Sequence, residues 1–561
     1  MSTHQRIGEF LLRRLREIGT SHVFGVPGDY NMAFLEQIEA DPDLTWVGTC
    51  NELNAAYAAD GHARGGRPGV LLTTYGVGCL SALNGVAGAY CEHIPLIHLS
   101  GSPPLHATRD GLRLHHSLLD GGYRNVHRAF AEFTAYSETI TPQTAVEVID
   151  HALLTAHRTR RPVRLELPSD LSHVEITVPT TILDVATTSG VASASREAAA
   201  VLSGALAEAR RPLLVVDLPA IRRGLMPAIE AFCAAHGVPY TCTVPAAHTA
   251  DPDAPLYLGL LPGSGRAQQA FAAADLLISC ELTETDVTTA GFTLDYADRP
   301  HVRLSADAVQ SGTEVYYGTD TADVLAATPT ATATAPEPPP APEPPEVPEP
   351  DAPLTQRAVF DALAGFLGPD DVLVAETGTA GQNTSGLQLP HGLRYVNQTS
   401  WGSIGFALPA LLGAALAEPQ RRHVLCVGDG SFQVTAQELS TILRLGLTPV
   451  IVLLDNRGYT IERAIMGAKS PYNDVAAWRY TDLPRAFGAD EHSLLLRSCR
   501  TGAELAAAFD AASHQASDGS RRFTLIRVHL DPLDMTPATE GVGEMTRVFD
   551  YGVKAPANPL G

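Results

Sequence analysis

The stretch that decides the fold runs from residue 423 to residue 446 and reads HVLCVGDGSFQVTAQELSTILRLG. Its apolar first part ends at Gly428, Asp429 and Gly430, and apolar residues at helical spacing follow. A buried strand that passes through a glycine turn into a helix is typical of a parallel α/β sheet. The backbone N–H groups and helix N-terminus at such a turn favour a phosphate, which the Asp429 carboxylate would repel.

A divalent cation would resolve this conflict. The next apolar run, PVIVLLDN (449–456), ends in Asn456, and the carboxyl ends of parallel strands meet at one edge of a sheet. Asp429, Asn456, the Gly458 carbonyl and phosphate oxygens would form the oxygen-rich site that suits Mg²⁺. A GDG turn alone is common, but the preceding strand, the following helix and the second strand ending in Asn make the pattern more specific.

The composition is that of an acidic globular protein with a large core. The chain has 561 residues, of which 45% are hydrophobic and 18% charged, and its formal net charge is −23. Nucleic acid and membrane are not expected partners, because phosphate binding needs clustered Lys and Arg and a membrane span needs about 20 apolar residues. The eight cysteines lack a CxxC pair, and residues 1–19 resemble a first helix more than a signal peptide. We therefore expect a cytoplasmic protein with reduced cysteines.

A segment rich in Pro and Glu divides the chain. Residues 328–353 have too few apolar side chains to fold and favour an extended linker. Short apolar runs alternate with helical patterns on both sides of it, with a break near residues 180–195. We predict three α/β domains with parallel sheets covered on both faces, at 1–182, 195–327 and 354–545, and a C-terminal tail at 546–561.

Several segments beyond the turn carry a family resemblance. GDG followed at a distance by Asn resembles the diphosphate-binding signature of thiamine diphosphate enzymes. Further segments follow along the chain in the order GVPGDYN (25–31), NELNAAYAADGHAR (51–64), LHHSLLDGGY (114–123), AETGT (375–379), WGSIGF (401–406) and GYTIERAI (458–465). In these segments and their order, the chain resembles the group that includes pyruvate, indolepyruvate and branched-chain 2-oxo acid decarboxylases.

The resemblance implies a fold, two cofactors and an activity. The three domains would be doubly wound parallel-sheet domains that bind the pyrimidine ring, form a central unit and bind the diphosphate. The cofactors would be thiamine diphosphate and Mg²⁺, bound between two subunits, so that a homodimer is the minimum active unit and homotetramers are common. The activity would be the non-oxidative decarboxylation of a 2-oxo acid, a small-molecule substrate, to an aldehyde and CO₂.

The same resemblance assigns five catalytic residues. Glu52 would hydrogen-bond the aminopyrimidine ring of the cofactor and activate it. Asp29, His115, His116 and Glu462 would supply proton transfer around the substrate, because carboxyl and imidazole groups can be tuned towards neutral pKa values. Each of these residue types also has an ordinary structural use, since Asp stabilises turns and Glu favours a first helical turn.

The resemblance also assigns residues that bind cofactor and metal. Ile404 would hold the cofactor bent from below, which is catalysis by positioning. The metal ligands would be Asp429, Asn456 and the Gly458 carbonyl. The cofactor-binding set is Pro27, Gly28, Glu52, Val77, Thr377, Thr379, Gly402, Ser403, Ile404, Gly428, Asp429, Gly430, Ser431, Asn456, Gly458, Tyr459, Thr460 and Ile461.

Two departures from the family pattern bear on the substrate. Asp455 replaces the first of two asparagines, which we expect to be tolerated. Residues 380–383 read AGQN where relatives commonly carry an aromatic residue, so we expect more room and a substrate larger than pyruvate, such as phenylpyruvate, indolepyruvate or a branched-chain 2-oxo acid. A pyruvate decarboxylase proper is the alternative. The expected pocket consists of Thr289, Phe292, Gly381, Gln382, Ile461 and Ile465.

Two other functions compete with decarboxylation. A carboligase on the same scaffold would pass the activated fragment to a second carbonyl compound, but that group lacks the set His115, His116 and Glu462. A degenerate paralogue that only binds cofactor would have lost a catalytic position, and none of the five is lost.

Overall fold

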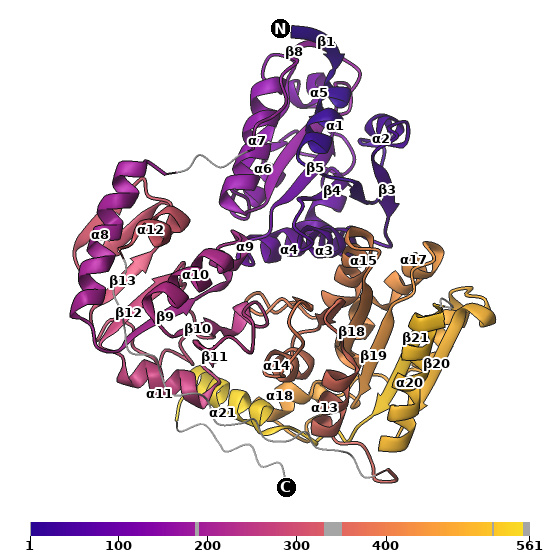
Figure 1. Cartoon of the computed structure of the whole chain (residues 1–561). Coiled ribbons are helices and arrows are strands. Elements are labelled where there is room, and N and C mark those ends of the chain that lie inside the picture. The colour runs from indigo at the N-terminus through magenta and orange to yellow at the C-terminus, as the bar shows by residue number, and fades with distance from the viewer. Residues whose placement is uncertain (1, 186–189, 330–349, 519–520, 554–561) are drawn as a thin grey trace.

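The computed structural model describes residues 2–185, 190–329, 350–518 and 521–553. Most of the linker predicted at 328–353 lies outside these residues. Figure 1 shows three α/β units, with the first at the top, the second at the left and the third at the right. Among the described helices, none combines the length and apolarity that crossing a membrane requires.

The first unit is built on a six-stranded parallel sheet in the order β3-β2-β4-β5-β7-β6. The prediction that residues 1–19 form one helix is wrong at its start. Residues 2–6 form β1, which pairs antiparallel with β8, and α1 begins only at Ile7. The strands are β1 (Ser2–Arg6), β2 (His22–Gly25), β3 (Thr45–Gly48), β4 (Gly69–Thr74), β5 (Leu96–Ser102), β6 (Tyr136–Thr139), β7 (Val163–Pro168) and β8 (Glu175–Pro179). The helices are α1 (Ile7–Glu17), α2 (Met32–Glu39), α3 (Glu52–Ala63), α4 (Val77–Cys91), α5 (Leu105–Arg109), α6 (Arg124–Ala131) and α7 (Ala145–Thr159).

The second unit has a seven-stranded sheet that is only mostly parallel. Its order is β11-β10-β9-β12-β13-β14-β15, and β14 and β15 join antiparallel at one edge. The strands are β9 (Pro212–Val216), β10 (Tyr240–Thr243), β11 (Tyr257–Leu261), β12 (Leu276–Cys280), β13 (His301–Leu304), β14 (Ala308–Ser311) and β15 (Glu314–Tyr317). The helices are α8 (Ala192–Glu208), α9 (Leu218–Arg222), α10 (Met226–His236), η1 (Val244–Ala246), α11 (Gly265–Ala273) and α12 (Thr321–Ala327).

The third unit has a six-stranded parallel sheet in the order β17-β16-β18-β19-β21-β20. Its last helix, α21, crosses the predicted start of the tail at residue 546. The strands are β16 (Asp371–Ala375), β17 (Arg394–Val396), β18 (Arg422–Gly428), β19 (Val450–Asp455), β20 (Leu494–Cys499) and β21 (Phe523–His529). The helices are α13 (Gln356–Phe366), α14 (Thr379–Ser385), α15 (Ala407–Ala417), α16 (Asp429–Thr435), η2 (Ala436–Glu438), α17 (Leu439–Arg444), α18 (Thr460–Ile465), η3 (Pro471–Asn473), η4 (Tyr480–Asp482), α19 (Leu483–Ala486), η5 (Glu491–Ser493), α20 (Gly502–Asp518) and α21 (Pro537–Tyr551).

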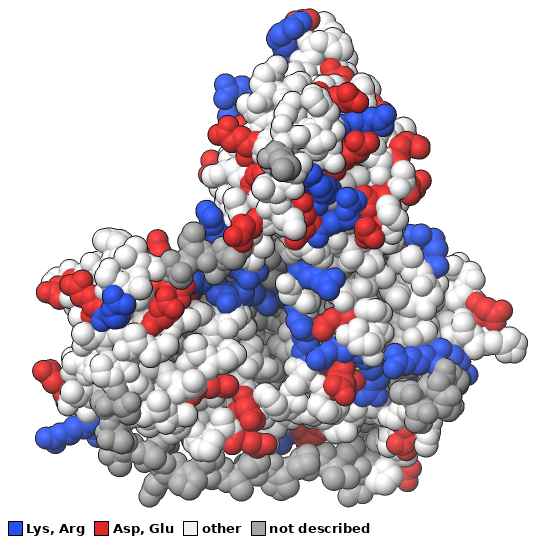
Figure 2. Space-filling view, turned by 45° about the horizontal axis from the view of Figure 1, so that its top comes forward, with Lys and Arg blue, Asp and Glu red and all other residues white. Residues whose placement is uncertain are grey.

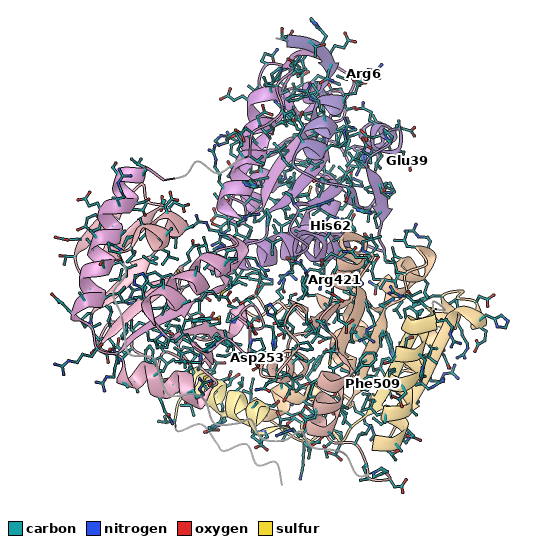
Figure 3. All side chains as sticks on the ribbon, viewed as in Figure 1. Arg6, Glu39, His62, Asp253, Arg421 and Phe509 are labelled. Atoms are coloured by element: carbon teal, nitrogen blue, oxygen red, sulfur yellow. The ribbon has the colours of Figure 1, made fainter. Side chains whose placement is uncertain are left out.

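Helices α3 and α15 pack the first unit against the third. Both are rich in Ala, and two glycines let their backbones approach closely. A Cβ on Gly61 would lie 2.1 Å from the Ala410 carbonyl oxygen, and one on Gly413 would lie 1.8 Å from that of Ala58. Figure 3 shows His62, on α3, where the two units meet. One hydrophobic core therefore runs from α3 through α15 to β18 and β19.

Candidate active site

The predicted site residues follow the carboxyl ends of neighbouring strands in two sheets. In the first sheet, Asp29 follows β2, Glu52 follows β3 and Val77 follows β4. In the third sheet, Asp429 follows β18 and Asn456 follows β19, while Thr377 and Thr379 follow β16. This is the edge at which parallel α/β sheets bind ligands, because loops and helix N-termini converge there.

Asp29, His115 and His116 form one cluster although they come from distant loops. The His115 Nε2 atom lies 2.7 Å from Asp29 Oδ2, and His116 Nδ1 lies 3.8 Å from Asp29 Oδ1. The His115 ring stacks on Tyr30, with 5.2 Å between ring centroids. Asp29 and His115 are exposed, so the cluster can reach a molecule bound at this edge. A carboxylate beside two imidazoles is suited to proton transfer.

Glu52 begins α3 and points towards the start of α4. The Asn51 side chain caps α3 by accepting the Asn54 N–H at 2.8 Å. Glu52 Oε1 lies 3.0 Å from the point where a Cβ on Gly78 would stand, so the absent side chain leaves space for the carboxyl group. His116 reaches the same turn, because a Cβ on Gly76 would lie 1.9 Å from its carbonyl oxygen. Glu52 and the Asp29 cluster thus border one turn.

Asp429, Asn456 and the Gly458 carbonyl converge on one point in the third unit. One end of the Asn456 amide lies 3.1 Å from Asp429 Oδ1 and 2.8 Å from the Gly458 oxygen. Asp429 Oδ2 is buried and has no hydrogen-bond partner among the described residues. Burial and the charge of Asp455 raise the pKa of Asp429 to about 7. A cation would satisfy the unpartnered oxygen and favour the ionised carboxylate, so these residues fit an Mg²⁺ site.

The two glycines that flank Asp429 have different structural roles. Nothing lies within 4 Å of the point where a Cβ on Gly428 would stand, so this side of the turn is open to a ligand. A Cβ on Gly430 would lie 2.4 Å from the Tyr459 ring, so Gly430 permits close packing inside the protein. The loops beside the turn also meet, because Ile461 packs against Gly378 and the Thr377 hydroxyl faces Gly402.

Ser403 and Ile404 differ in their surroundings. The Ser403 hydroxyl lies 2.5 Å from the Tyr57 hydroxyl and accepts a hydrogen bond from Asn84 at 3.0 Å, so it is tied to the first unit. Ile404 is 39% exposed, and Val77 at the start of α4 is 55% exposed. Apolar side chains left open beside a polar site are expected where a ligand or a second chain covers them.

The structure does not bring the two groups of residues together within one chain. Within the described part of the chain, no hydrogen bond or ion pair joins Asp29, Glu52, His115 or His116 to Asp429, Asn456 or Glu462. In Figure 1, α2, which follows Asp29, lies near the top, and α18, which carries an exposed Glu462, lies near the bottom. The chain therefore holds two half-sites on different units.

The residues predicted for the substrate pocket meet only in part. Phe292 packs on Phe549 of α21 with 5.6 Å between ring centroids, and α21 packs on α18, which carries Ile461 and Ile465. Thr289 is buried, and its hydroxyl donates to the Thr285 carbonyl and accepts the Phe292 N–H. Gly381 is buried, and a Cβ there would lie 2.7 Å from Asn397 Nδ2 and 2.8 Å from the Glu376 carbonyl oxygen. The space expected at Gly381 is thus filled by packing, while Gln382 is half-buried.

A separate cavity lies at the amino ends of the strands of the third sheet, opposite the ends that carry the predicted site residues. It encloses about 180 Å³ near the starts of β18, β19 and β21 and contains none of the predicted site residues. Its lining includes Arg421, which Figure 3 labels below α15, together with Arg422, Arg521 and Arg522. Figure 2 shows Lys and Arg side chains gathered across the middle of the face that it draws, within an otherwise acidic protein.

Comparison with known proteins matches all three units. The chain matches the models for the thiamine pyrophosphate enzyme N-terminal TPP binding domain at residues 5–122, the central domain at 199–319 and the C-terminal TPP binding domain at 378–528. A protein of Mycolicibacterium paratuberculosis named alpha-keto-acid decarboxylase is 39% identical over 543 residues, which cover 94% of each chain. One of the same name from Mycobacterium leprae is 36% identical over 558 residues, covering 97% of this chain and 96% of the relative.

The chain belongs to the thiamine pyrophosphate-dependent 2-oxo acid decarboxylase family. The predicted fold class and family are thereby confirmed, and thiamine diphosphate (thiamine pyrophosphate) is the cofactor that its two binding domains hold. The parallel sheets of the first and third units are those that match the two TPP-binding models.

Three features of this decarboxylase family member were missed by sequence reasoning. Glu376 and Glu438 are buried carboxyl groups that hydrogen-bond the backbone of the site loops. Their position inside AETGT and TAQELST gave no sign of burial. Helix α21 occupies the start of the predicted tail. Thr536 followed by Pro537 is a helix-start signal that indicates this helix, and the Thr536 side chain accepts the Thr539 N–H.

Proposed function

We propose that the protein catalyses the thiamine diphosphate- and Mg²⁺-dependent decarboxylation of a 2-oxo acid to an aldehyde and CO₂. The observation that carries the proposal is the cluster of Asp29, His115 and His116 at the carboxyl edge of the first sheet. The name alpha-keto-acid decarboxylase of the relatives supports the same reaction. The bound cofactor supplies the nucleophilic carbon and the electron sink for loss of CO₂.

Each half-site has its own task in this proposal. Asp429, Asn456 and the Gly458 carbonyl hold Mg²⁺, and the open face at Gly428 receives the diphosphate. Glu52 orients and activates the pyrimidine ring. Asp29, His115, His116 and Glu462 hold and move the proton that the product aldehyde needs, and each such group contributes about 10²–10⁴-fold.

The separation of the half-sites supports assembly from two copies of the chain. The first unit of one copy would supply Asp29, Glu52 and the histidines, and the third unit of the other would supply Asp429 and Glu462. Val77 and Ile404 are exposed beside the half-sites, as expected of apolar side chains that a second copy of the chain would cover. A homodimer is thus the minimum active unit, and pairing of dimers into a homotetramer extends the same proposal. The eight free cysteines accord with a cytoplasmic location.

The substrate is proposed to be larger than pyruvate. The support is that residues 380–383 include no aromatic side chain. Because packing fills the space at Gly381, the additional room for a substrate would lie beside Gln382. Phe292, 58% exposed, and Ile465 would line an apolar side for a phenyl, indolyl or branched-chain group. Pyruvate itself is the alternative.

The test is direct measurement of CO₂ and aldehyde from a substrate panel. Pyruvate, 2-oxoisovalerate, 2-oxoisocaproate, phenylpyruvate and indolepyruvate would be compared by kcat/KM with thiamine diphosphate and Mg²⁺ present, with and without an acceptor aldehyde. We expect CO₂ and free aldehyde, with the highest kcat/KM for a bulky substrate. A ligated product in place of the free aldehyde would indicate a carboligase. Absence of CO₂ from every substrate, with cofactor bound, would reject the decarboxylase proposal for this set.

A further inference from the structure

Glu376, which lies between β16 and α14, carries a carboxyl group that none of the roles above uses. Its side chain is 1% exposed. Oε1 accepts the Thr377 N–H at 3.0 Å, and Oε2 accepts the N–H groups of Gly405 at 3.1 Å and Ala407 at 3.2 Å. Among the residues that the structure describes, no Lys, Arg or His side chain forms an ion pair with it.

The hydrogen-bond partners of Glu376 favour one protonation state of its carboxyl group. Burial raises its pKa to about 7, although the three backbone N–H groups act in the opposite direction. All three partners are N–H donors, so the ionised carboxylate can accept a hydrogen bond from each of them. If the carboxyl group were protonated, its own O–H would face one of these N–H groups, and neither could accept from the other. Tyr57 on α3, in the first unit, is an ionisable group that interacts with Glu376: burial raises the pKa of Tyr57 to about 12, and the charge of Glu376 acts in the same direction.

The Glu376 carboxylate connects two loops of the predicted cofactor site, and a further hydrogen bond ties the second loop to α16. It precedes Thr377 in the first loop. Its partner Gly405 follows Ile404 in the second loop, and the Gly405 carbonyl accepts a hydrogen bond of 2.8 Å from the Thr435 hydroxyl. Thr435 ends α16, the helix that begins at Asp429. The end of β16, the loop that carries Ile404 and the end of α16 are thereby tied together.

The held loop has little freedom to move elsewhere. Gly405 has a φ of +87°, a conformation that side chains other than glycine rarely adopt. A Cβ there would lie 2.8 Å from Val434 Cγ1, so the loop packs directly on α16. The Ala407 N–H is the first of α15, where a negative group is favoured by the helix dipole. Loss of the carboxylate would release Gly405 and Ala407 together.

We propose that Glu376 is a positioning residue that holds the loop 402–406, and with it Ile404, in the shape that receives thiamine diphosphate. The inference rests on the proposed function, because it presumes that the cofactor binds beside these loops. It concerns binding alone, and it can therefore be tested without any 2-oxo acid.

The experiment compares thiamine diphosphate affinity of the full-length apoprotein and its Glu376→Gln variant. Binding is measured by titration calorimetry with Mg²⁺ present, and tryptophan fluorescence, to which Trp401 beside the loop contributes, gives a second readout. Hydrogen bonds to a charged group are stronger than those to a neutral amide, so we expect Kd to rise about 10- to 100-fold. Glu418→Gln, which alters a carboxylate paired with Arg394 and Arg421 away from the loop, is the matched control.

The pH dependence separates positioning by the carboxylate from a general packing role. The ratio of variant to wild-type Kd should be largest at about pH 8 and fall towards unity at about pH 6, where the wild-type group is itself protonated. Thr435→Val, which removes the hydroxyl on the other side of Gly405, should weaken binding in the same direction and serves if Glu376→Gln does not fold. Affinity within about twofold of wild type for Glu376→Gln, or for Thr435→Val in its place, would overturn the inference. Cofactor binding by the wild type without any decarboxylation would instead reject the proposed function and leave this result standing.

Discussion

Asn54 Nδ2 donates a hydrogen bond of 2.6 Å to Glu438 Oε2 and so joins the first unit to the third. The Cys50 N–H donates to the same oxygen at 3.2 Å. Glu52 lies between these two residues, so Glu438 holds both sides of the turn that starts α3. Glu438 is fully buried, and it ends η2, which continues directly from α16 and the Asp429 turn. The position of Glu52 therefore depends on a residue of the third unit of the same chain.

Glu438→Ala should lower both stability and activity. Removing the acceptor leaves the buried Asn54 amide without its partner, which costs about 1–3 kcal/mol, and also releases the N–H of the exposed Cys50. Displacement of Glu52 by about 1 Å should lower kcat by about 10²-fold. Urea unfolding and kcat measure the two effects. Glu438→Gln retains an acceptor oxygen for both donors and should lie close to wild type, so equal loss in the two variants would speak against this explanation.

Asp429→Asn should abolish Mg²⁺-dependent binding of thiamine diphosphate. The change removes the charge that a hard cation needs while it keeps the shape of the side chain. Asp455→Asn is the informative comparison, because Asp455 pairs with Arg527 at 2.5 Å and not with the proposed metal. We expect Asp455→Asn to lower the free energy of unfolding but to retain Mg²⁺-dependent binding in calorimetry. Retained Mg²⁺ dependence in Asp429→Asn would exclude Asp429 as a ligand.

His115→Phe should lower kcat by about 10²–10⁴-fold and leave cofactor affinity unchanged. The replacement can keep the stacking on Tyr30 but loses the nitrogen that lies 2.7 Å from Asp29. Steady-state kinetics and a thiamine diphosphate titration separate the two quantities. His106→Ala, at an exposed histidine on α5, is the control. A variant with normal kcat would remove His115 from the proton-transfer set.

Glu376→Gln should become more stable relative to wild type as the pH rises. The pKa of Glu376 is raised from 4.5 to about 7 by burial. Between these values the folded protein keeps a proton that the unfolded chain has lost, so the wild type loses stability as pH increases through this window. The shift corresponds to about 3 kcal/mol. Urea unfolding of both apoproteins between about pH 5 and pH 8 measures it. Parallel curves would show that the pKa is not raised.

The half-sites could be predicted as far as strand ends and turns define them. Asp429 and Asn456 follow adjacent parallel strands, and the alternation of apolar runs and helices indicates this arrangement. The proximity of Asp29 to His115 and His116 could not be derived in this way. It depends on how the loop around residue 116 folds against Gly76, which is a tertiary contact without a local sequence signal.

Packing of small residues explains the other differences. Gly381 looks like open space in the sequence, but its missing side chain is what allows Asn397 and the Glu376 carbonyl to approach. The β1 strand is a polar segment that directly precedes α1, and it forms because β8 supplies a partner some 170 residues later, where Gln5 faces Ile176. Tertiary pairing of this kind overrides local propensity.

The central claim is that two copies of the chain each contribute one half of every active site, and mixing of inactive variants tests it most directly. Glu52→Gln changes the first half-site and Glu462→Gln changes the second, so a mixed dimer would contain one site with both changes and one intact site. Random co-assembly should restore about a quarter of wild-type CO₂ release. A mixture of Glu52→Gln with His115→Phe, both in the first half-site, should restore none. Absence of rescue in the first mixture, with mixed dimers demonstrated, would contradict the account.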